Sequence, residues 1–231
     1  MNPVQPAYVI HTRNYRETSG LIDIITQDMG RISLVARGYK TSRKGLLAAL
    51  QPFRKLEVSW SGKGDLKTLV SAEEISRPVF LQGSALTGGL YINELLLRLL
   101  HPYDPCPGLF ESYESTLDNL RNGGREEATL RVYEKNLLEE LGYGLELGVT
   151  IGGDMIEEGQ MYYYRPHEGL VPATQSLDNG VMISGRSLLC LLHEQLEEPQ
   201  VLKETKRLMR LLIEQHLDGR PLRTRDLYRF L

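Results

Sequence analysis

The residues with the most distinctive chemistry lie in a basic segment, residues 37–45, whose sequence is RGYKTSRKG. Four of its nine residues are cationic, none is acidic, and Tyr39 stands among them. The cations are Arg37, Lys40, Arg43 and Lys44. Cationic side chains follow a phosphate backbone and an aromatic ring stacks on a base, so this composition is typical of a nucleic-acid-binding loop. The alternative is a solvated hairpin loop that binds nothing, because runs of charge usually only face water.

Other cations in the first 80 residues extend this candidate nucleic-acid surface. The full set of candidate contacts is Arg13, Arg16, Arg31, Arg37, Tyr39, Lys40, Arg43, Lys44, Lys63 and Lys67. Tyr15 and Tyr39 are flanked by polar residues, so a stacking role and a core position both stay open for them. Tyr8, Phe53 and Trp60 stand in alternating segments, where aromatic residues usually pack inward, and we expect them in the core.

A second basic set lies near the end of the chain, on one side of a helix expected over residues 199–217. Its members are Lys203, Lys206, Arg207 and Arg210, and apolar residues occupy the other side of the helix. Arg131 lies in another expected helix beside Leu130 and Tyr133. Cations at the rim of an apolar groove would recognise a short acidic peptide that ends in an aromatic carboxylate. A solvated helix face is the alternative.

Charge is distributed unevenly along the chain. Residues 1–80 carry 12 Lys and Arg against 7 Asp and Glu, residues 81–202 carry 7 against 19, and residues 203–231 carry 8 against 4. The formal net charge of −3 therefore hides two basic ends and an acidic middle. Because a binding surface needs only local positive potential, the low total does not argue against a nucleic-acid partner.

No set of residues predicts catalysis or metal binding. The five histidines stand singly, and Cys106 and Cys190 are far apart without the spacing of a zinc or redox motif. The glycine-rich stretches lack the lysine and spacing of a phosphate loop. We therefore expect a protein that is not an enzyme and that uses no cofactor and no metal. A hydrolase whose site the spacing does not reveal is the open alternative.

The remaining composition indicates a cytoplasmic protein. Two cysteines fit a reducing compartment. The first residues do not read as a signal peptide. No stretch approaches the roughly 18 apolar residues of a membrane span. An apolar fraction of 41% is ordinary for a globular chain, so we expect a real core.

Period-two alternation over residues 8–72 predicts the element that must hold the basic segment. Five strands are expected, at residues 8–13, 21–26, 31–37, 53–60 and 66–72, with tight turns between most of them. Five strands in about 65 residues match an OB-fold, and a small SH3-like barrel is the main competitor. The fold class is therefore α+β, with a five-stranded OB-fold barrel at the N-terminus.

After residue 80 the period changes to 3.6, which predicts a helical domain over residues 81–231. The expected helices cover residues 84–100, 109–120, 126–141, 185–195, 199–217 and 225–231. Residues 148–180 contain six glycines and no cysteine. They are interpreted as an irregular insertion with a short hairpin at the tyrosine run 162–164. The predicted domains are thus residues 1–80 and 81–231.

Several blocks of this sequence resemble the RecO family of bacterial recombination mediators, over nearly the full length of the chain. The most specific blocks are residues 89–96, GLYINELL, and residues 141–144, LGYG; residues 219–227, GRPLRTRDL, form a third. Many members of the family carry a four-cysteine zinc finger after LGYG. Residues 148–180 have no cysteine, so the chain resembles the metal-free branch.

The resemblance implies a function without catalytic turnover. Such proteins bind single- and double-stranded DNA, anneal complementary strands, and bind the acidic C-terminal tail of the single-stranded-DNA-binding protein SSB. With RecR they help RecA load on SSB-coated DNA. The resemblance assigns DNA to the barrel's basic surface and the SSB tail to Arg131, Lys203, Lys206, Arg207 and Arg210. It also implies a nucleoid-associated protein. An RNA-binding OB-fold module in tRNA or ribosome handling is the alternative.

Overall fold

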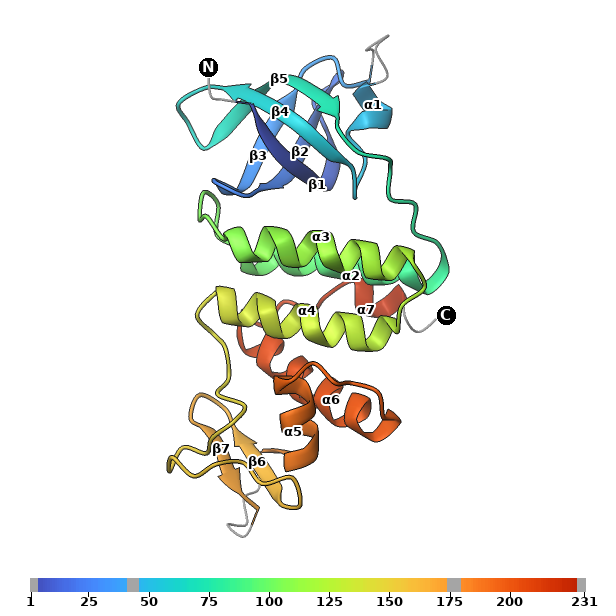
Figure 1. Ribbon diagram of the computed structural model, residues 1–231. Helices are drawn as coiled ribbons and strands as arrows, with labels where there is room; N and C mark the ends of the chain where they lie inside the picture. The colour runs from blue at the N-terminus through green and yellow to red at the C-terminus, as the bar shows by residue number, and fades with distance from the viewer. Residues whose placement is uncertain (1–3, 41–45, 174–179, 228–231) are drawn as a thin grey trace. The chain divides into compact units, whose positions relative to one another are not determined.

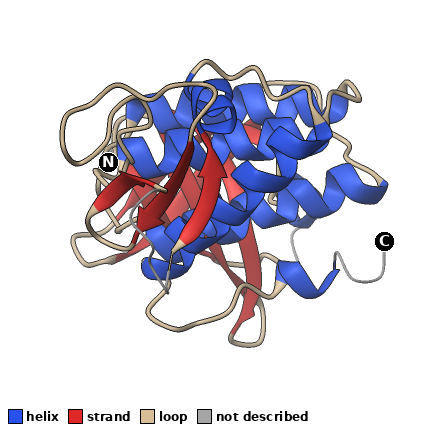
Figure 2. Cartoon of the chain, turned by 90° about the horizontal axis from the view of Figure 1, so that it is seen from below, coloured by secondary structure: helices blue, strands red, loops and turns tan. Residues whose placement is uncertain are grey.

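The computed structural model describes residues 4–40, 46–173 and 180–227. The chain divides into two compact units, each with strands and helices (Figure 1). Figure 2 distinguishes the helices, strands and loops by colour. The first unit combines Met1–Gly123 with Leu222–Leu231, and the second is Gly124–Pro221. Within the described residues no helix is long and apolar enough to cross a membrane.

The first unit begins with a closed barrel of five strands in the order β1-β2-β3-β5-β4. All neighbouring strands are antiparallel except β3 and β5, which are parallel. The barrel confirms the predicted five-stranded OB-like fold, and the short helix α1, Leu46–Ala49, lies between β3 and β4. The strands are β1 (Gln5–Tyr15), β2 (Ser19–Thr26), β3 (Gly30–Ala36), β4 (Lys55–Ser61) and β5 (Leu66–Glu74).

Alternation along the strands fills the barrel with apolar side chains. In β3 the residues Ile32, Leu34 and Ala36 are buried, while the residues between them are half-buried. Trp60 is fully buried in the same core. Tyr8 and Phe53 are also buried, so the prediction that these three aromatic residues belong to the core is confirmed.

Besides α1, the described part of this unit contains three more helices, and two features of α2 attach it to the barrel. A Cβ atom at Gly89 would lie 2.5 Å from the end of the Leu81 side chain and 3.0 Å from the Phe53 ring, so a larger residue here would force both side chains to shift. The Asn93 side-chain amide donates to the Ile10 carbonyl of β1 at 2.8 Å. Its oxygen accepts from the Tyr113 hydroxyl of α3 at 2.7 Å. The helices are α2 (Gly83–Leu99), α3 (Pro107–Arg121) and α7 (Thr224–Leu227).

The second unit joins helices to a three-stranded sheet of order β7-β6-β8. The predicted hairpin at the tyrosine run is β6 with β7, and β8 adds a strand that the sequence did not predict. Residues Val181–Ser184 are too few, and alternate too weakly, for the sequence to indicate a strand. Only their pairing with β6 defines β8. The elements are α4 (Glu126–Glu140), β6 (Met161–Arg165), β7 (Gly169–Pro172), β8 (Val181–Ser184), α5 (Gly185–Leu192) and α6 (Pro199–Gln215).

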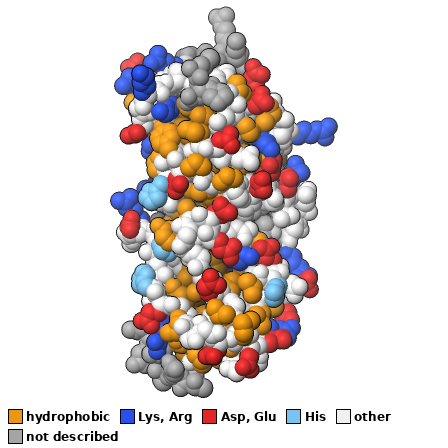
Figure 3. All heavy atoms as spheres, turned by 60° about the vertical axis from the view of Figure 1, so that its left-hand side comes forward, with side chains coloured by type: hydrophobic (Ala, Val, Ile, Leu, Met, Phe, Trp, Pro, Cys, Tyr) orange, Lys and Arg blue, Asp and Glu red, His pale blue; other side chains and the backbone are white. Residues whose placement is uncertain are grey.

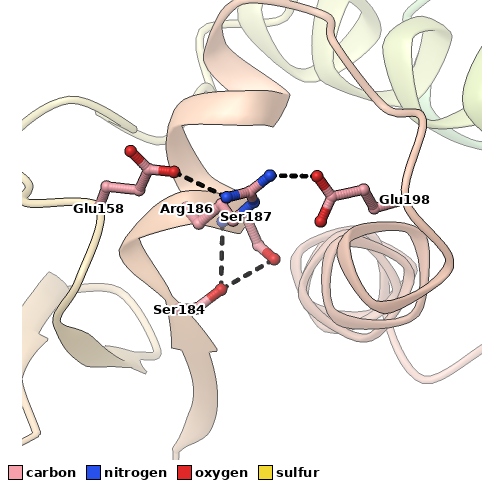
Figure 4. Close-up of polar contacts among 5 residues, drawn as sticks. All are labelled: Glu158, Ser184, Arg186, Ser187 and Glu198. Carbon is pink, nitrogen blue, oxygen red and sulfur yellow. Dashed lines mark hydrogen bonds and ion pairs between the residues drawn. The ribbon is translucent and has the colours of Figure 1, made fainter.

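Ser184 marks the junction of β8 and α5 (Figure 4). Its hydroxyl oxygen accepts from the Ser187 backbone N–H at 3.2 Å and donates to the Glu204 carboxylate at 2.7 Å. Beside it, the Arg186 guanidinium donates to Glu158 at 3.0 Å and also to Glu198. Serine as an N-cap satisfies a donor of the first helical turn, so these contacts explain why α5 starts here.

Candidate nucleic-acid and peptide interfaces

Two loops meet at one end of the barrel, and Tyr39 holds them together. The Tyr39 ring is only 5% exposed and lies over Gly20, where a Cβ atom would be 2.8 Å from the ring. The next residue, Lys40, donates its backbone N–H to the Thr18 carbonyl at 3.2 Å. Residues 37–40 are therefore fixed against the corner between β1 and β2. The structure places Tyr39 in the core, so its ring is not presented to a base.

Four exposed cations surround this junction. Arg13 is near the end of β1, Arg16 is in the β1–β2 corner, and Arg37 and Lys40 follow β3. Arg16 has a positive φ of 55° and its guanidinium lies 5.2 Å from the centre of the half-buried Tyr15 ring. Within the described part of the chain none of the four forms an ion pair, so their charges face solvent. Glu17, in the same corner, is the acidic neighbour. Arg43 and Lys44 lie outside the described residues.

Two other candidate cations, Arg31 and Lys67, lie near Tyr103, toward the opposite end of β3. The Arg31 side chain donates to the Leu100 carbonyl at 3.0 Å, and the Lys67 ammonium lies 5.2 Å from the Tyr103 ring centre. Lys63 is exposed in the turn between β4 and β5. Because β3 rises about 3.3 Å per residue, Arg31 and Arg37 are about 20 Å apart. The candidate DNA contacts thus form two groups, of which the junction at Tyr39 has the freer charges.

Helix α6 presents the second basic set. Lys203, Lys206, Arg207 and Arg210 are all exposed, as predicted from their spacing. Lys206 pairs with Glu127 at 3.0 Å and Arg210 with Glu214 at 2.9 Å. Neither Lys203 nor Arg207 has an ion-pair partner among the described residues. The opposite side of α6 is buried through Leu208, Met209, Leu212 and Ile213. On the face of the molecule in Figure 3, acidic and basic side chains are scattered between exposed hydrophobic ones.

Arg131 differs from the other cations of this set because it is buried. It is 8% exposed, and its guanidinium donates to Glu134 one helical turn further along α4. The Arg131 Nε atom has no hydrogen-bond partner among the described residues. A buried cation beside a buried carboxylate is already neutralised, so in this structure Arg131 does not add charge to the rim of a groove.

A serine, a histidine and an aspartate lie close together in the barrel, but their hydrogen bonds differ from those of a catalytic triad. His11, Asp23 and Ser33 stand side by side on β1, β2 and β3. Burial acts to raise the pKa of Asp23, but hydrogen bonds from His11 and Ser33, with the Arg31 charge, bring the pKa below its usual value. Serine and histidine both bond the carboxylate, whereas nucleophilic activation requires serine to bond histidine. In the parts of the chain that the structure describes, no group of three metal-binding side chains occurs. The absence of a metal and of an activity stays a prediction.

Comparison with known proteins identifies the family of this chain. The model of the recombination protein O N-terminal domain matches residues 1–77, and that of the C-terminal domain matches residues 81–226. A DNA repair protein RecO from Methylococcus capsulatus is 46% identical over 96% of this chain and 91% of its own length. Proteins with the same name from Nitrosococcus oceani and Halorhodospira halophila are 42% and 43% identical, over 97% and 98% of this chain and 92% and 97% of their own lengths. These matches span both compact units, and the chain therefore belongs to the RecO family of DNA repair proteins.

Proposed function

We propose that this protein is a DNA repair and recombination mediator that binds single- and double-stranded DNA through its barrel and anneals complementary strands. The observation that carries the proposal is the contact between two loops at Tyr39, beside four cations that have no ion-pair partner among the described residues, at one end of an OB-like barrel. Such a surface follows a phosphate backbone without reading its sequence. Annealing requires no ATP in this proposal, because neutralising the phosphates of both strands lowers their mutual repulsion.

The proposed protein partner is the acidic C-terminal tail of SSB, bound on the exposed face of α6. Lys203 and Arg207 have no ion-pair partners among the described residues and stand four positions apart, so one carboxylate-rich segment can contact both. Arg131 is left out of this proposed site because Glu134 already neutralises it. With RecR, the DNA-bound protein would then help RecA to load on SSB-coated DNA.

A crossed set of charge reversals tests both sites. We expect Arg37→Glu with Lys40→Glu to weaken binding of a fluorescent single-stranded oligonucleotide and to leave binding of an SSB-tail peptide unchanged. Lys203→Glu with Arg207→Glu should do the reverse. Fluorescence anisotropy at low salt measures both affinities. If instead the barrel variant lost binding of the tail peptide and the α6 variant lost binding of the oligonucleotide, our assignment of the two sites would be reversed.

Competition between ligands separates this function from the RNA-binding alternative. Equal lengths of single-stranded DNA and RNA are added to the DNA complex, and SSB is captured with and without its last residues. We expect DNA to compete at least as well as RNA and the truncated SSB to be lost from the capture. Preference for RNA together with no tail-dependent capture would favour an RNA-handling module.

A further inference from the structure

The unit Gly124–Pro221 contains a pocket of about 370 Å³ that neither proposed interface uses. It lies between the end of α4, the loop before β6, the β6–β7 turn and the end of α6. Its volume is within the range of sites that hold a small ligand or one or two amino-acid residues. Leu145, Leu170 and Leu212 provide apolar lining, and the polar lining includes Tyr143, Glu146 and Gln215.

Gln215 lines this pocket, and its side-chain amide contains a buried donor that has no partner among the described residues. The Tyr164 hydroxyl donates to the Gln215 side-chain oxygen at 3.1 Å, which fixes the orientation of the amide. The amide nitrogen Nε2 of Gln215 is buried and has no acceptor among the described residues. Leaving such a donor unpaired is unfavourable, so a ligand that brings a carbonyl oxygen would be stabilised by this amide once the Gln215 side chain turns into the pocket.

An aromatic stack forms another part of the wall. The Tyr143 and His216 rings are parallel within 14°, with their centres 3.9 Å apart. Burial lowers the pKa of His216 and the nearby His167 lowers it further, so His216 is neutral at neutral pH. Tyr143 is 42% exposed and is accessible to a further group. An aromatic face of this kind accepts a planar cation.

The charges around the pocket favour a cationic ligand. Glu146 and Glu168 both line it; Glu168 is paired with Arg165 at 3.2 Å, whereas Glu146 has no ion-pair partner among the described residues. The whole unit carries 10 Lys and Arg against 17 Asp and Glu. Phosphates and acidic peptides would be repelled here, which separates this pocket chemically from the basic face of α6.

We propose that this pocket binds an arginine residue of a partner peptide. The peptide carbonyl accepts from Gln215, the aliphatic stem packs on the leucines, and the guanidinium pairs with Glu146 against the Tyr143 ring. Arginine fits better than lysine because its planar group both stacks on an aromatic face and forms paired hydrogen bonds with a carboxylate. The surface would thus recruit a basic partner segment, in addition to the acidic one proposed for α6.

The probe for this proposal is Nα-acetyl-arginine-N-methylamide, titrated into the full chain and followed by the NMR signals of the histidine rings. We expect saturable shifts of the His216 ring, with a dissociation constant near about 1 mM, as befits a single residue. The citrulline analogue has the same shape without the charge and should bind about threefold to fivefold more weakly. Equal binding of citrulline, or no saturable shift up to about 10 mM of the arginine probe, would overturn the proposal.

Two variants assign the contacts. Glu146→Gln changes only an exposed side chain, so it should fold normally and weaken the arginine probe about threefold while leaving citrulline unchanged. Gln215→Met keeps the volume but removes both the Nε2 donor and the oxygen that accepts from the Tyr164 hydroxyl, and should weaken both probes equally. Binding of DNA and of the acidic tail peptide should be unchanged in both variants, so a failure here is distinct from a failure of the proposed function. If Glu146→Gln bound both probes like the unmodified chain, the charge assignment would be wrong.

Discussion

Glu94 and Thr224 are 130 positions apart in sequence and share two hydrogen bonds. The Glu94 Oε2 atom accepts from the Thr224 backbone N–H at 2.9 Å and from its hydroxyl at 2.8 Å. The Oε1 atom accepts from the Arg223 backbone N–H at 2.9 Å. One carboxylate on α2 thus caps the first turn of α7 and attaches the end of the chain to the first unit.

Replacement of Glu94 by glutamine tests the strength of this attachment. Glu94→Gln puts an NH₂ group where an acceptor oxygen stood, so at least one of the three donors loses its partner. We expect a loss of about 1–2 kcal/mol in the free energy of unfolding at pH 7, measured with urea. Amide exchange at residues 223 and 224 should accelerate. Glu111→Gln, at an exposed position on α3, is the matched control and should change the stability by less than about 0.5 kcal/mol. Unchanged exchange at both amides would contradict the contact.

The same carboxylate predicts a pH dependence. Burial acts to raise the pKa of Glu94, but the hydrogen bonds from Thr224 and Arg223, with the charge of Arg98, bring it below its ordinary value of 4.5. Because the unfolded chain binds the proton more tightly, the contribution of Glu94 is complete above about pH 4.5 and is lost as the pH falls through the lower, folded value. Protonated glutamate resembles glutamine, so the difference in stability between the unmodified chain and Glu94→Gln should shrink from pH 7 to pH 3. A difference that stayed constant with pH would show that the pKa of Glu94 is the same in the folded and the unfolded chain.

The attachment of α2 to the barrel gives a third prediction. An alanine at residue 89 would normally favour a helix by about 1 kcal/mol. Here its Cβ would lie 2.5 Å from Leu81 and 3.0 Å from the Phe53 ring, so we expect Gly89→Ala to destabilise the first unit by about 1–3 kcal/mol. Ser84→Ala, at an exposed position of the same helix, is the control and should be neutral or slightly stabilising. The two midpoints of urea unfolding are compared, and a stabilised Gly89→Ala protein would mean that α2 does not pack this closely.

Local periodicity accounts for what could be predicted from the sequence. The five strands of the barrel and the helices α2 to α6 follow from alternation of period 2 and 3.6, because each element has one apolar face to bury. The exposed face of α6 follows from the same pattern, and all four of its cations are on it.

Contacts between distant residues could not be predicted in this way. Tyr39 stands between a glycine and a lysine, and its burial depends on Gly20, which leaves space for the ring on another strand. Arg131 looked like a rim cation because its partner Glu134 is only recognisable as buried once α4 is packed. The bonds of Glu94 to α7 and the pocket beside Gln215 likewise join segments that no local pattern relates.

The cations at the Tyr39 junction allow a quantitative prediction of how DNA affinity depends on salt. Each phosphate contact on duplex DNA contributes about −0.9 to the slope of log affinity against log salt, so Arg16→Gln with Arg37→Gln should make the slope less steep by about 1.8. Arg31→Gln is the control, since its side chain already bonds the Leu100 carbonyl at the other end of β3 and should change the slope little. Affinity for a duplex is measured by anisotropy across a range of salt concentrations. If Arg31→Gln changed the slope more than the double variant did, the phosphate contacts would lie mainly at the Tyr103 end of the barrel. The proposed DNA surface would then have to be placed there.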